Sequence, residues 1–279
     1  MEPDSRFRYT RSVHFTDLTV LQATMTRFSY DRHAHDEHAF GVTLTGRQHF
    51  FSGGEYHRST PGTVIHFNPG EVHDGHSGSD APLNYVMAYI PARRLEPLIA
   101  AAGGTRGGKI LLDEPRVRDP ELKRSIVDLV RLIASGAGDE IEEEQALFRI
   151  AAGVAQHAGC FDPGGNAGGN TRNTDSLLMR AKDYIDSHAG RDLSLDDVSR
   201  AANLSKFHFL RLFRRQFGIT PHKYVLSCRV NAARAALEAG EPLDDVVYRY
   251  RFADLSHFNR RFKRIYGMTP RQYQRSIAC

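Results

Sequence analysis

The sequence is poor in cysteine and lacks long apolar segments. Its three cysteines, Cys160, Cys228 and Cys279, lie far apart in 279 residues. This spacing argues against a disulfide framework or a thiolate zinc site, and it suits a reducing compartment. No uncharged apolar run approaches the ~20 residues that span a bilayer, and the start of the chain lacks the basic and apolar regions of a signal peptide. We therefore expect a cytoplasmic protein with no membrane partner.

The charge is unevenly distributed along the chain. The net charge is +4, but residues 175–279 hold 19 Lys and Arg against 11 Asp and Glu, which gives +8, whereas the remainder holds 18 against 22, which gives −4. A basic second half is compatible with a polyanionic partner but does not identify one. The length favours two domains. A segment rich in Gly and Asn predicts a flexible linker at 160–174, between domains at 1–159 and 175–279.

The first domain changes period along its length. Short aromatic and β-branched runs with turn signals between them, over residues 7–91, predict a small β-sandwich or barrel. Apolar residues then recur at helical spacing over 116–159, which predicts an antiparallel helix pair appended to the barrel. Two interpretations of this pair stay open, because a helical stripe shows burial without naming the partner: the helices cover one barrel face, or they form a homodimer surface.

The second domain contains an internal repeat. Leu195-Asp-Asp-Val198 returns 48 residues later as Leu243-Asp-Asp-Val246. A second set returns 49 residues later: His208-Phe209, Phe213, Gly218, Thr220-Pro221 and Tyr224 become His257-Phe258, Phe262, Gly267, Thr269-Pro270 and Tyr273. Matches at a near-constant offset mark a duplicated structural unit, with one residue inserted in the turn of the second copy.

Each repeat predicts a helix-turn-helix unit. Ser194 can cap a short helix with Asp197 as capping-box partner, and Ser205 can cap the helix that follows. That second helix buries a stripe of Phe and leaves a basic free face, and Gly218 ends it. Thr220-Pro221 then begins a long helix over about 221–239. Such a connector can hold two recognition helices in successive major grooves of DNA.

These features strongly resemble the AraC/XylS type of DNA-binding domain across 175–279. Arg229-Val-Asn-Ala-Ala-Arg-Ala-Ala-Leu237 is similar to the linker helix of that family, and 252–273 is similar to its C-terminal signature. The family usually has Gly where this chain has Arg251. If the position requires positive φ, Arg costs about 1 kcal/mol there and alters the second turn.

The resemblance implies roles for the exposed residues of both recognition helices. Base-facing positions would be Phe207, Leu210 and Arg211 in the first unit, and Leu255, Ser256, Asn259 and Arg260 in the second. Arg can read guanine, Asn can read adenine, and apolar side chains can contact the thymine methyl group. Basic residues further round each helix would contact phosphates: Arg214, Arg215, Lys263 and Arg264.

Histidines concentrate in the first domain, where eight of 14 lie between 33 and 76. Together with the turn signals around them, they resemble the two motifs of the cupin barrel, here of the arabinose-binding sensor type. In metal-binding cupins the matching residues converge inside the barrel, and here they would be His33, His35, Glu37 and His73. These side chains suit a divalent metal as the one possible cofactor, and neutral histidines equally suit hydrogen bonds to an organic effector. The organic effector is the preferred interpretation.

Taken together, the sequence predicts an α+β multidomain chain with a cupin-like barrel, an appended helix pair and an all-α domain of two helix-turn-helix units. The expected function is that of a sequence-specific transcription regulator, not an enzyme, with double-stranded DNA, a small-molecule effector and a second copy of the chain as partners. Two rivals are a metal-dependent cupin enzyme with a DNA-binding appendage and a constitutive DNA-binding protein. The sign of regulation, the effector and the operator stay open.

Overall fold

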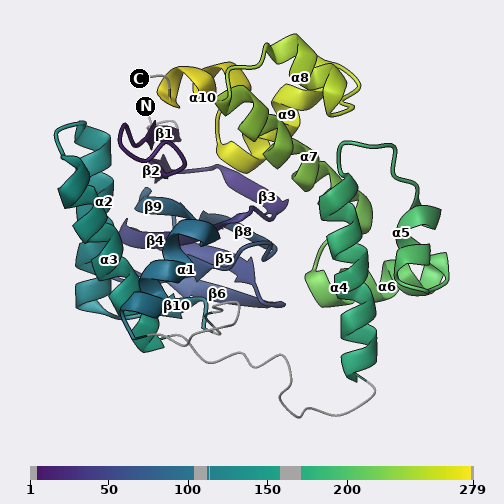
Figure 1. Cartoon of the computed structure of the whole chain (residues 1–279), viewed down its shortest axis with the longest axis horizontal. Helices are drawn as coiled ribbons and strands as arrows, with labels where there is room; N and C mark the ends of the chain where they lie inside the picture. The colour runs from purple at the N-terminus through teal and green to yellow at the C-terminus, as the bar shows by residue number, and fades with distance from the viewer. Residues whose placement is uncertain (1–4, 104–111, 113, 158–170, 278–279) are drawn as a thin grey trace.

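The first domain is built from two antiparallel β-sheets (Figure 1). The computed structural model describes residues 5–103, 112, 114–157 and 171–277, without the side chains of 171–175. The six-stranded sheet has the order β1 (Arg6–Arg11), β2 (Thr19–Met25), β9 (Leu83–Pro91), β4 (Glu37–Thr45), β7 (Val64–Phe67) and β10 (Arg116–Val117). The four-stranded sheet has the order β3 (Ser29–His33), β8 (His73–Ser77), β5 (Gln48–Ser52) and β6 (Glu55–Ser59).

Alternation along the strands gives the six-stranded sheet two apolar faces. On β4, Ala39 joins the core inside the barrel, whereas Phe40 and Val42 face a second core outside it. That second core is covered by three helices, α1 (Ala92–Ala101), α2 (Pro120–Ser135) and α3 (Glu140–His157). The expected helix pair therefore covers one face of the barrel. Helix α1 was not predicted; it begins directly after β9, with Pro91 at its N-cap and no capping side chain.

The second domain is entirely helical in its described part. Helix α4 (Thr171–His188) is followed by two units, α5 (Leu195–Ala201) with α6 (Lys206–Phe217) and α8 (Leu243–Arg249) with α9 (Leu255–Tyr266). Helix α7 (Pro221–Glu238) joins the units and α10 (Pro270–Ile277) follows the second. The predicted fold class, an α+β chain with a cupin-like sheet domain before an all-helical domain, is confirmed.

Helix ends in the repeat follow the predicted capping chemistry with one exception. Ser194 and Asp197 form a reciprocal capping box, and the Thr220 side chain accepts a hydrogen bond from the Lys223 amide. Ser205 occupies the N-cap of α6, but its side chain makes no capping hydrogen bond. The equivalent residue of α9, Asp254, does cap, and it accepts from the His257 amide at 2.6 Å.

The two domains share one hydrophobic core. Barrel residues such as Leu21 and Phe50 belong to the same cluster as Val230 of α7 and Tyr273 of α10. Figure 1 shows α7, α9 and α10 lying along the side of the barrel that carries β1 and β3. Most of the linker predicted at 160–174 lies outside the described residues, and 171–174 form the first turn of α4. The domain boundaries thus stay a prediction, whereas the close contact between the domains was not foreseen.

Candidate DNA-binding surface and effector site

The first recognition helix, α6, presents a mixed apolar and basic surface to solvent. Phe209, Leu212 and Phe213 are buried on its inner side. Phe207, an apolar side chain, is 86% exposed, which is unfavourable in water and suits a contact with a base edge. The other predicted DNA-binding residues of this helix are exposed or half-buried on its outer side: Leu210, Arg211, Arg214 and Arg215.

The second recognition helix, α9, repeats the arrangement. Its inner side buries Phe258, Phe262, Ile265 and Tyr266. Ser256, Arg260, Lys263 and Arg264 are exposed, whereas Leu255 and Asn259 are half-buried. Leu255 also packs against the shared core, so only part of its side chain is free for a base contact. All the predicted positions therefore keep some access to solvent, and their roles in DNA binding stay predictions.

The turns inside the two units contain equivalent left-handed residues. Asn203 has φ +50° and Arg251, 48 positions later, has φ +59°. Asn tolerates this region, whereas an Arg there is strained by roughly 1 kcal/mol. The position of Arg251 therefore does require the positive φ that glycine adopts in the family. The Arg251 guanidinium lies 3.7 Å from the carboxylate of Asp192, which precedes α5.

Helix α7 holds the units together from inside the domain. Arg229 donates to the carbonyl oxygens of Ala189 and Arg191, at 2.9 and 3.0 Å, which ties α7 to the end of α4. The Tyr224 hydroxyl donates to Asp186 at 2.8 Å, and burial raises the pKa of Tyr224. The connector is therefore anchored along its length, as a stiff spacer between two recognition helices requires.

The barrel brings three of the predicted histidines together. The ring centres of His33 and His73 are 4.4 Å apart, and those of His35 and His73 are 4.8 Å apart. Each Nδ1 lies within 2.9 Å of a backbone carbonyl oxygen, which can only accept a hydrogen bond. The proton is therefore on Nδ1 and each Nε2 is an acceptor. Burial lowers the pKa of all three, that of His35 to about 4, so the cluster is neutral at pH 7.

These residues do not fit a metal centre. Among the described residues, no group of three or more His, Cys, Asp or Glu side chains is arranged to hold a metal ion. The fourth predicted ligand, Glu37, lies 3.9 Å from His35 Nδ1, but its carboxylate is already in an ion pair with Arg234 of α7. Burial alone would raise the pKa of Glu37, but the charge and hydrogen bond of Arg234, together with the neighbouring His35, outweigh burial and lower it to about 2.

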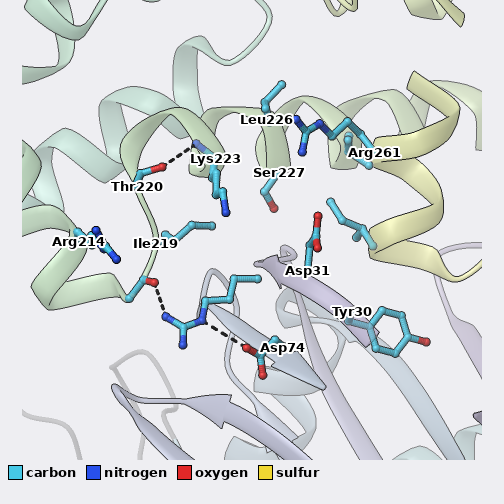
Figure 2. Close-up of a pocket in the computed structure, with 14 residues that line it drawn as sticks. Tyr30, Asp31, Asp74, Arg214, Ile219, Thr220, Lys223, Leu226, Ser227 and Arg261 are labelled. Atoms are coloured by element: carbon cyan, nitrogen blue, oxygen red, sulfur yellow. Dashed lines mark hydrogen bonds and ion pairs between the residues drawn. The ribbon is translucent and has the colours of Figure 1, made fainter. Parts of the chain in front are cut away.

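A cleft between the domains is lined by several charged side chains. Its volume is about 630 Å³, and it is lined from the barrel by Asp31, Arg32 and Asp74 and from the helical domain by Arg214, Lys223 and Arg261, among others (Figure 2). Apolar side chains of α7 and α9, such as Leu226 and Ile265, complete the wall. Four cations thus face two carboxylates.

Within this cleft, Arg32 already contacts three other residues. It donates to Asp74 at 3.3 Å and to the carbonyl oxygen of Gly218, and its guanidinium carbon lies 3.6 Å from the ring centre of Phe51. Among the described residues, Arg214 and Lys223 have no ion-pair partner. The cleft therefore has an excess of positive charge suited to an anionic ligand.

Sequence reasoning missed both Arg234 and this cleft. Arg234 sits within a stripe of small residues on α7, and a charge in such a stripe is a signal for a buried ion pair. The cleft could not be found, because its two walls come from segments nearly 200 residues apart.

Comparisons with known proteins agree with this architecture. Residues 15–151 match the AraC-like ligand binding domain and residues 198–276 match a helix-turn-helix domain. The HTH-type transcriptional regulator YbfI of Bacillus subtilis (strain 168) is 24% identical over 227 residues, which cover 81% of this chain and 80% of YbfI. MarA of Escherichia coli (strain K12) is 31% identical over 83 residues, 29% of this chain and 65% of MarA.

Solved structures of ToxT from Vibrio cholerae share the fold. The apo form of a ToxT variant gives a TM-score of 0.58 at 12% identity, over 94% of this chain and 98% of that chain. ToxT bound to an unsaturated fatty acid gives 0.56 at 13% identity, over 100% and 98% of the two chains. At these identities the similarity establishes the fold alone.

A ligand-binding sheet domain joined to two helix-turn-helix units defines a class of DNA-binding transcription regulators. This chain belongs to the AraC family of that class, and its relatives are regulators rather than enzymes. In the described part of the chain, no helix is both long and apolar enough to cross a membrane.

Proposed function

We propose that this protein is a one-component regulator that reads two adjacent DNA half-sites with α6 and α9 under the control of a small anionic effector. The observation that carries the proposal is the cleft between the domains. Arg214 belongs to α6, Arg261 to α9 and Arg32 to the barrel, and all three line it. A ligand bound there would contact the barrel and both recognition helices at once.

Such a ligand can change DNA binding by a direct route. A ligand shifts an equilibrium only through its differential affinity for two states. An anion held between barrel and helices would favour one relative position of α6 and α9 over others. The ToxT complexes with an unsaturated fatty acid and with a naphthyl-butenoic acid are precedents for an organic acid on this fold.

The experiment is a thermal-shift screen of the full chain against small carboxylates and phosphates, each paired with its neutral amide or alcohol. We expect anions alone to raise the melting temperature, and Lys223→Ala to abolish the rise. An exposed arginine on the outer strand β6 supplies the control Arg58→Ala, which should respond like the unmodified chain. Equal shifts from acids and neutral analogues would contradict an anion site.

The histidine cluster supports a second place for the effector. His35 Nε2 is buried without a hydrogen-bond partner, so it could accept one from an organic ligand inside the barrel. His73→Ala separates the two sites. If the effector binds in the barrel, this variant loses the ligand-induced shift and Lys223→Ala keeps it; the cleft site gives the opposite pattern.

We also propose that α3 forms a homodimer contact. Ile141 and Phe148 lie two turns apart on one side of α3 and are 63% and 43% exposed. Exposed apolar side chains at this spacing favour a helical partner. Sedimentation of the full chain should change from dimer to monomer in Ile141→Glu/Phe148→Glu; an unmodified chain that sediments as a monomer would contradict the contact. We also propose a cytoplasmic location, because the proposed partner is DNA.

A further inference from the structure

The two recognition helices end in equivalent glycines that contact the barrel. Gly218 follows α6 and Gly267 follows α9, 49 positions later, and both have left-handed φ values of +68° and +76°. A left-handed residue after a helix explains why glycine is favoured at these positions. It does not explain why a barrel side chain lies against each of them.

The first glycine lies against Phe51 of β5. A Cβ at Gly218 would lie 2.6 Å from two atoms of the Phe51 ring and 3.0 Å from the Arg32 guanidinium. That guanidinium lies over the same ring and donates to the Gly218 carbonyl oxygen at the C-terminal end of α6. A cation there also complements the negative end of the helix dipole. Ring and cation thus fix the end of α6 together.

The second glycine lies against Phe7 of β1, in the other sheet of the barrel. A Cβ at Gly267 would lie 2.6 Å from two atoms of the Phe7 ring. Phe7 is itself held by edge-on contacts to Phe28 at 5.0 Å and Tyr30 at 5.9 Å. The end of α9 therefore rests on an aromatic cluster that belongs to the barrel.

Other left-handed glycines show that this contact is specific. Gly136 ends α2 with φ +64°, and Gly240 lies just beyond α7 with φ +85°, yet a Cβ at either would meet no atom within 4 Å. Close approach of a ring is therefore not a general consequence of the left-handed conformation. It occurs at the ends of both recognition helices.

We infer that Phe7 and Phe51 are specificity-determining residues that fix the distance and angle between α6 and α9, so that the chain selects DNA by the spacing of two half-sites. The inference rests on the proposed DNA-binding function and goes beyond it by giving the barrel a role in site selection. Helix α7 joins the two units from inside, and the two rings hold them from outside.

The geometry of DNA makes this spacing selective. One added base pair moves the second half-site by about 3.4 Å and rotates it by about 34°, since a turn contains 10–10.5 base pairs. Two recognition helices in a rigid arrangement cannot follow that change. Without the two rings, α6 and α9 keep the connection through α7 and the shared core but lose the contacts at their C-terminal ends, so they should tolerate the change better.

The test compares half-site spacing in the full chain and in Phe7→Ala/Phe51→Ala. A preferred duplex is first selected with the unmodified chain from a random pool, and its spacer is then lengthened or shortened by one base pair. We expect the unmodified chain to discriminate against the altered spacers by about tenfold or more, the cost of a poorly matched site. In the double variant the ratio should fall below about threefold, and Phe7→Leu/Phe51→Leu should recover part of it.

Two measurements keep the outcome unambiguous. Gly218→Ala places a methyl group against the Phe51 ring and should also alter spacer preference, whereas Gly240→Ala carries the same left-handed strain in open space and should not. Thermal melting identifies variants that fail to fold, and the leucine pair then serves as the test. Folded variants that keep the spacer ratio of the unmodified chain would overturn the inference. An unmodified chain that selects no duplex would instead overturn the proposed function.

Discussion

The carboxylate of Glu37, at the start of β4, forms an ion pair with the guanidinium of Arg234 on α7, although 197 residues separate the two. Arg234 Nε also lies 3.6 Å from Glu238, and its guanidinium carbon lies 5.7 Å from the ring centre of Tyr266. Both partners of the pair are almost fully enclosed. The contact therefore joins the barrel to the helix that separates the two recognition helices.

Removing one member of this pair should destabilise the whole chain. Glu37→Gln leaves the buried Arg234 charge without its full partner, and breaking a buried pair in this way costs about 3–5 kcal/mol. Replacing both, as Glu37→Leu/Arg234→Met, removes the unpaired charge and should cost much less. Urea unfolding of the full chain measures both. A loss below about 1 kcal/mol for Glu37→Gln would show that the pair contributes little.

Acid should weaken the barrel through its buried histidines. Burial lowers the pKa of His33, His35 and His73, and that of His38 to about 4, so the folded chain binds fewer protons than the unfolded chain between about pH 4 and 6.5. Their stabilising contribution is complete above about pH 6.5 and is lost as the pH falls toward 4. Each such group gives a slope of about 1.4 kcal/mol per pH unit in the free energy of unfolding.

The measurement is the free energy of unfolding against pH for the full chain and for His35→Gln. Because one titrating group is removed, the variant should show a shallower slope between pH 4 and 6.5. His222, which is exposed on α7, supplies the control His222→Gln. Identical slopes for the unmodified chain and His35→Gln would mean that His35 does not titrate in this range. Glu37, which lies 3.9 Å from His35 Nδ1, contributes at lower pH: its pKa is depressed to about 2, so its stabilising contribution is lost as the pH falls below about 4.5.

The sequence predicted the helical domain in more detail than the barrel site, for a physical reason. The contacts that define a helix-turn-helix unit are local. Ser194, Asp197 and Gly218 each form hydrogen bonds with residues three or four positions away, so these contacts can be predicted from the sequence pattern. The repeat then supplied the Phe stripe and the helix-ending glycine in a second copy, although Pro242 replaces the capping serine before α8. The convergence of His33, His35 and His73 was also within reach, because the cupin resemblance supplied the topology.

Contacts between distant segments could not be predicted in this way. Glu37 was expected beside the histidines from the cupin resemblance, and its carboxylate does lie 3.9 Å from His35 Nδ1, but its ion pair with Arg234, 197 residues away, was not predictable. Likewise, the fit of Phe51 against Gly218 depends on how two domains dock. No periodicity or spacing within either domain contains that information.

Replacing the strained arginine of the second turn should stabilise the protein. Arg251 has φ +59°, which glycine adopts without steric cost, so Arg251→Gly should raise the free energy of unfolding by about 0.5–1 kcal/mol. The exposed contact with Asp192 that the change removes is worth little. Asn203→Gly, at the equivalent position of the first turn, should gain less, because Asn tolerates this conformation. Chemical unfolding measures both, and a loss of stability in Arg251→Gly would show that its side chain makes a stabilising contact.

The last prediction concerns the two classes of basic residue on the recognition helices. Arg211 and Arg260 occupy outer positions suited to base edges, so Arg211→Ala or Arg260→Ala should cost about 1–3 kcal/mol on the selected duplex and relax preference at defined base pairs. Lys263 should bind phosphate, so Lys263→Ala should weaken all sequences alike and reduce the salt dependence by about one counterion.

Binding of the full chain to the selected duplex and to a scrambled one, each at several salt concentrations, separates the classes. A bidentate contact to a base is lost only where that base is present, whereas a phosphate contact exists on every sequence. Arg58→Ala, which removes the same charge from the outer strand β6, controls for the general effect of net charge. If Arg211→Ala, Arg260→Ala and Lys263→Ala lose affinity equally on both duplexes, all three residues contact the backbone, and sequence must then be read by Phe207, Ser256 and Asn259 or by the shape of the DNA.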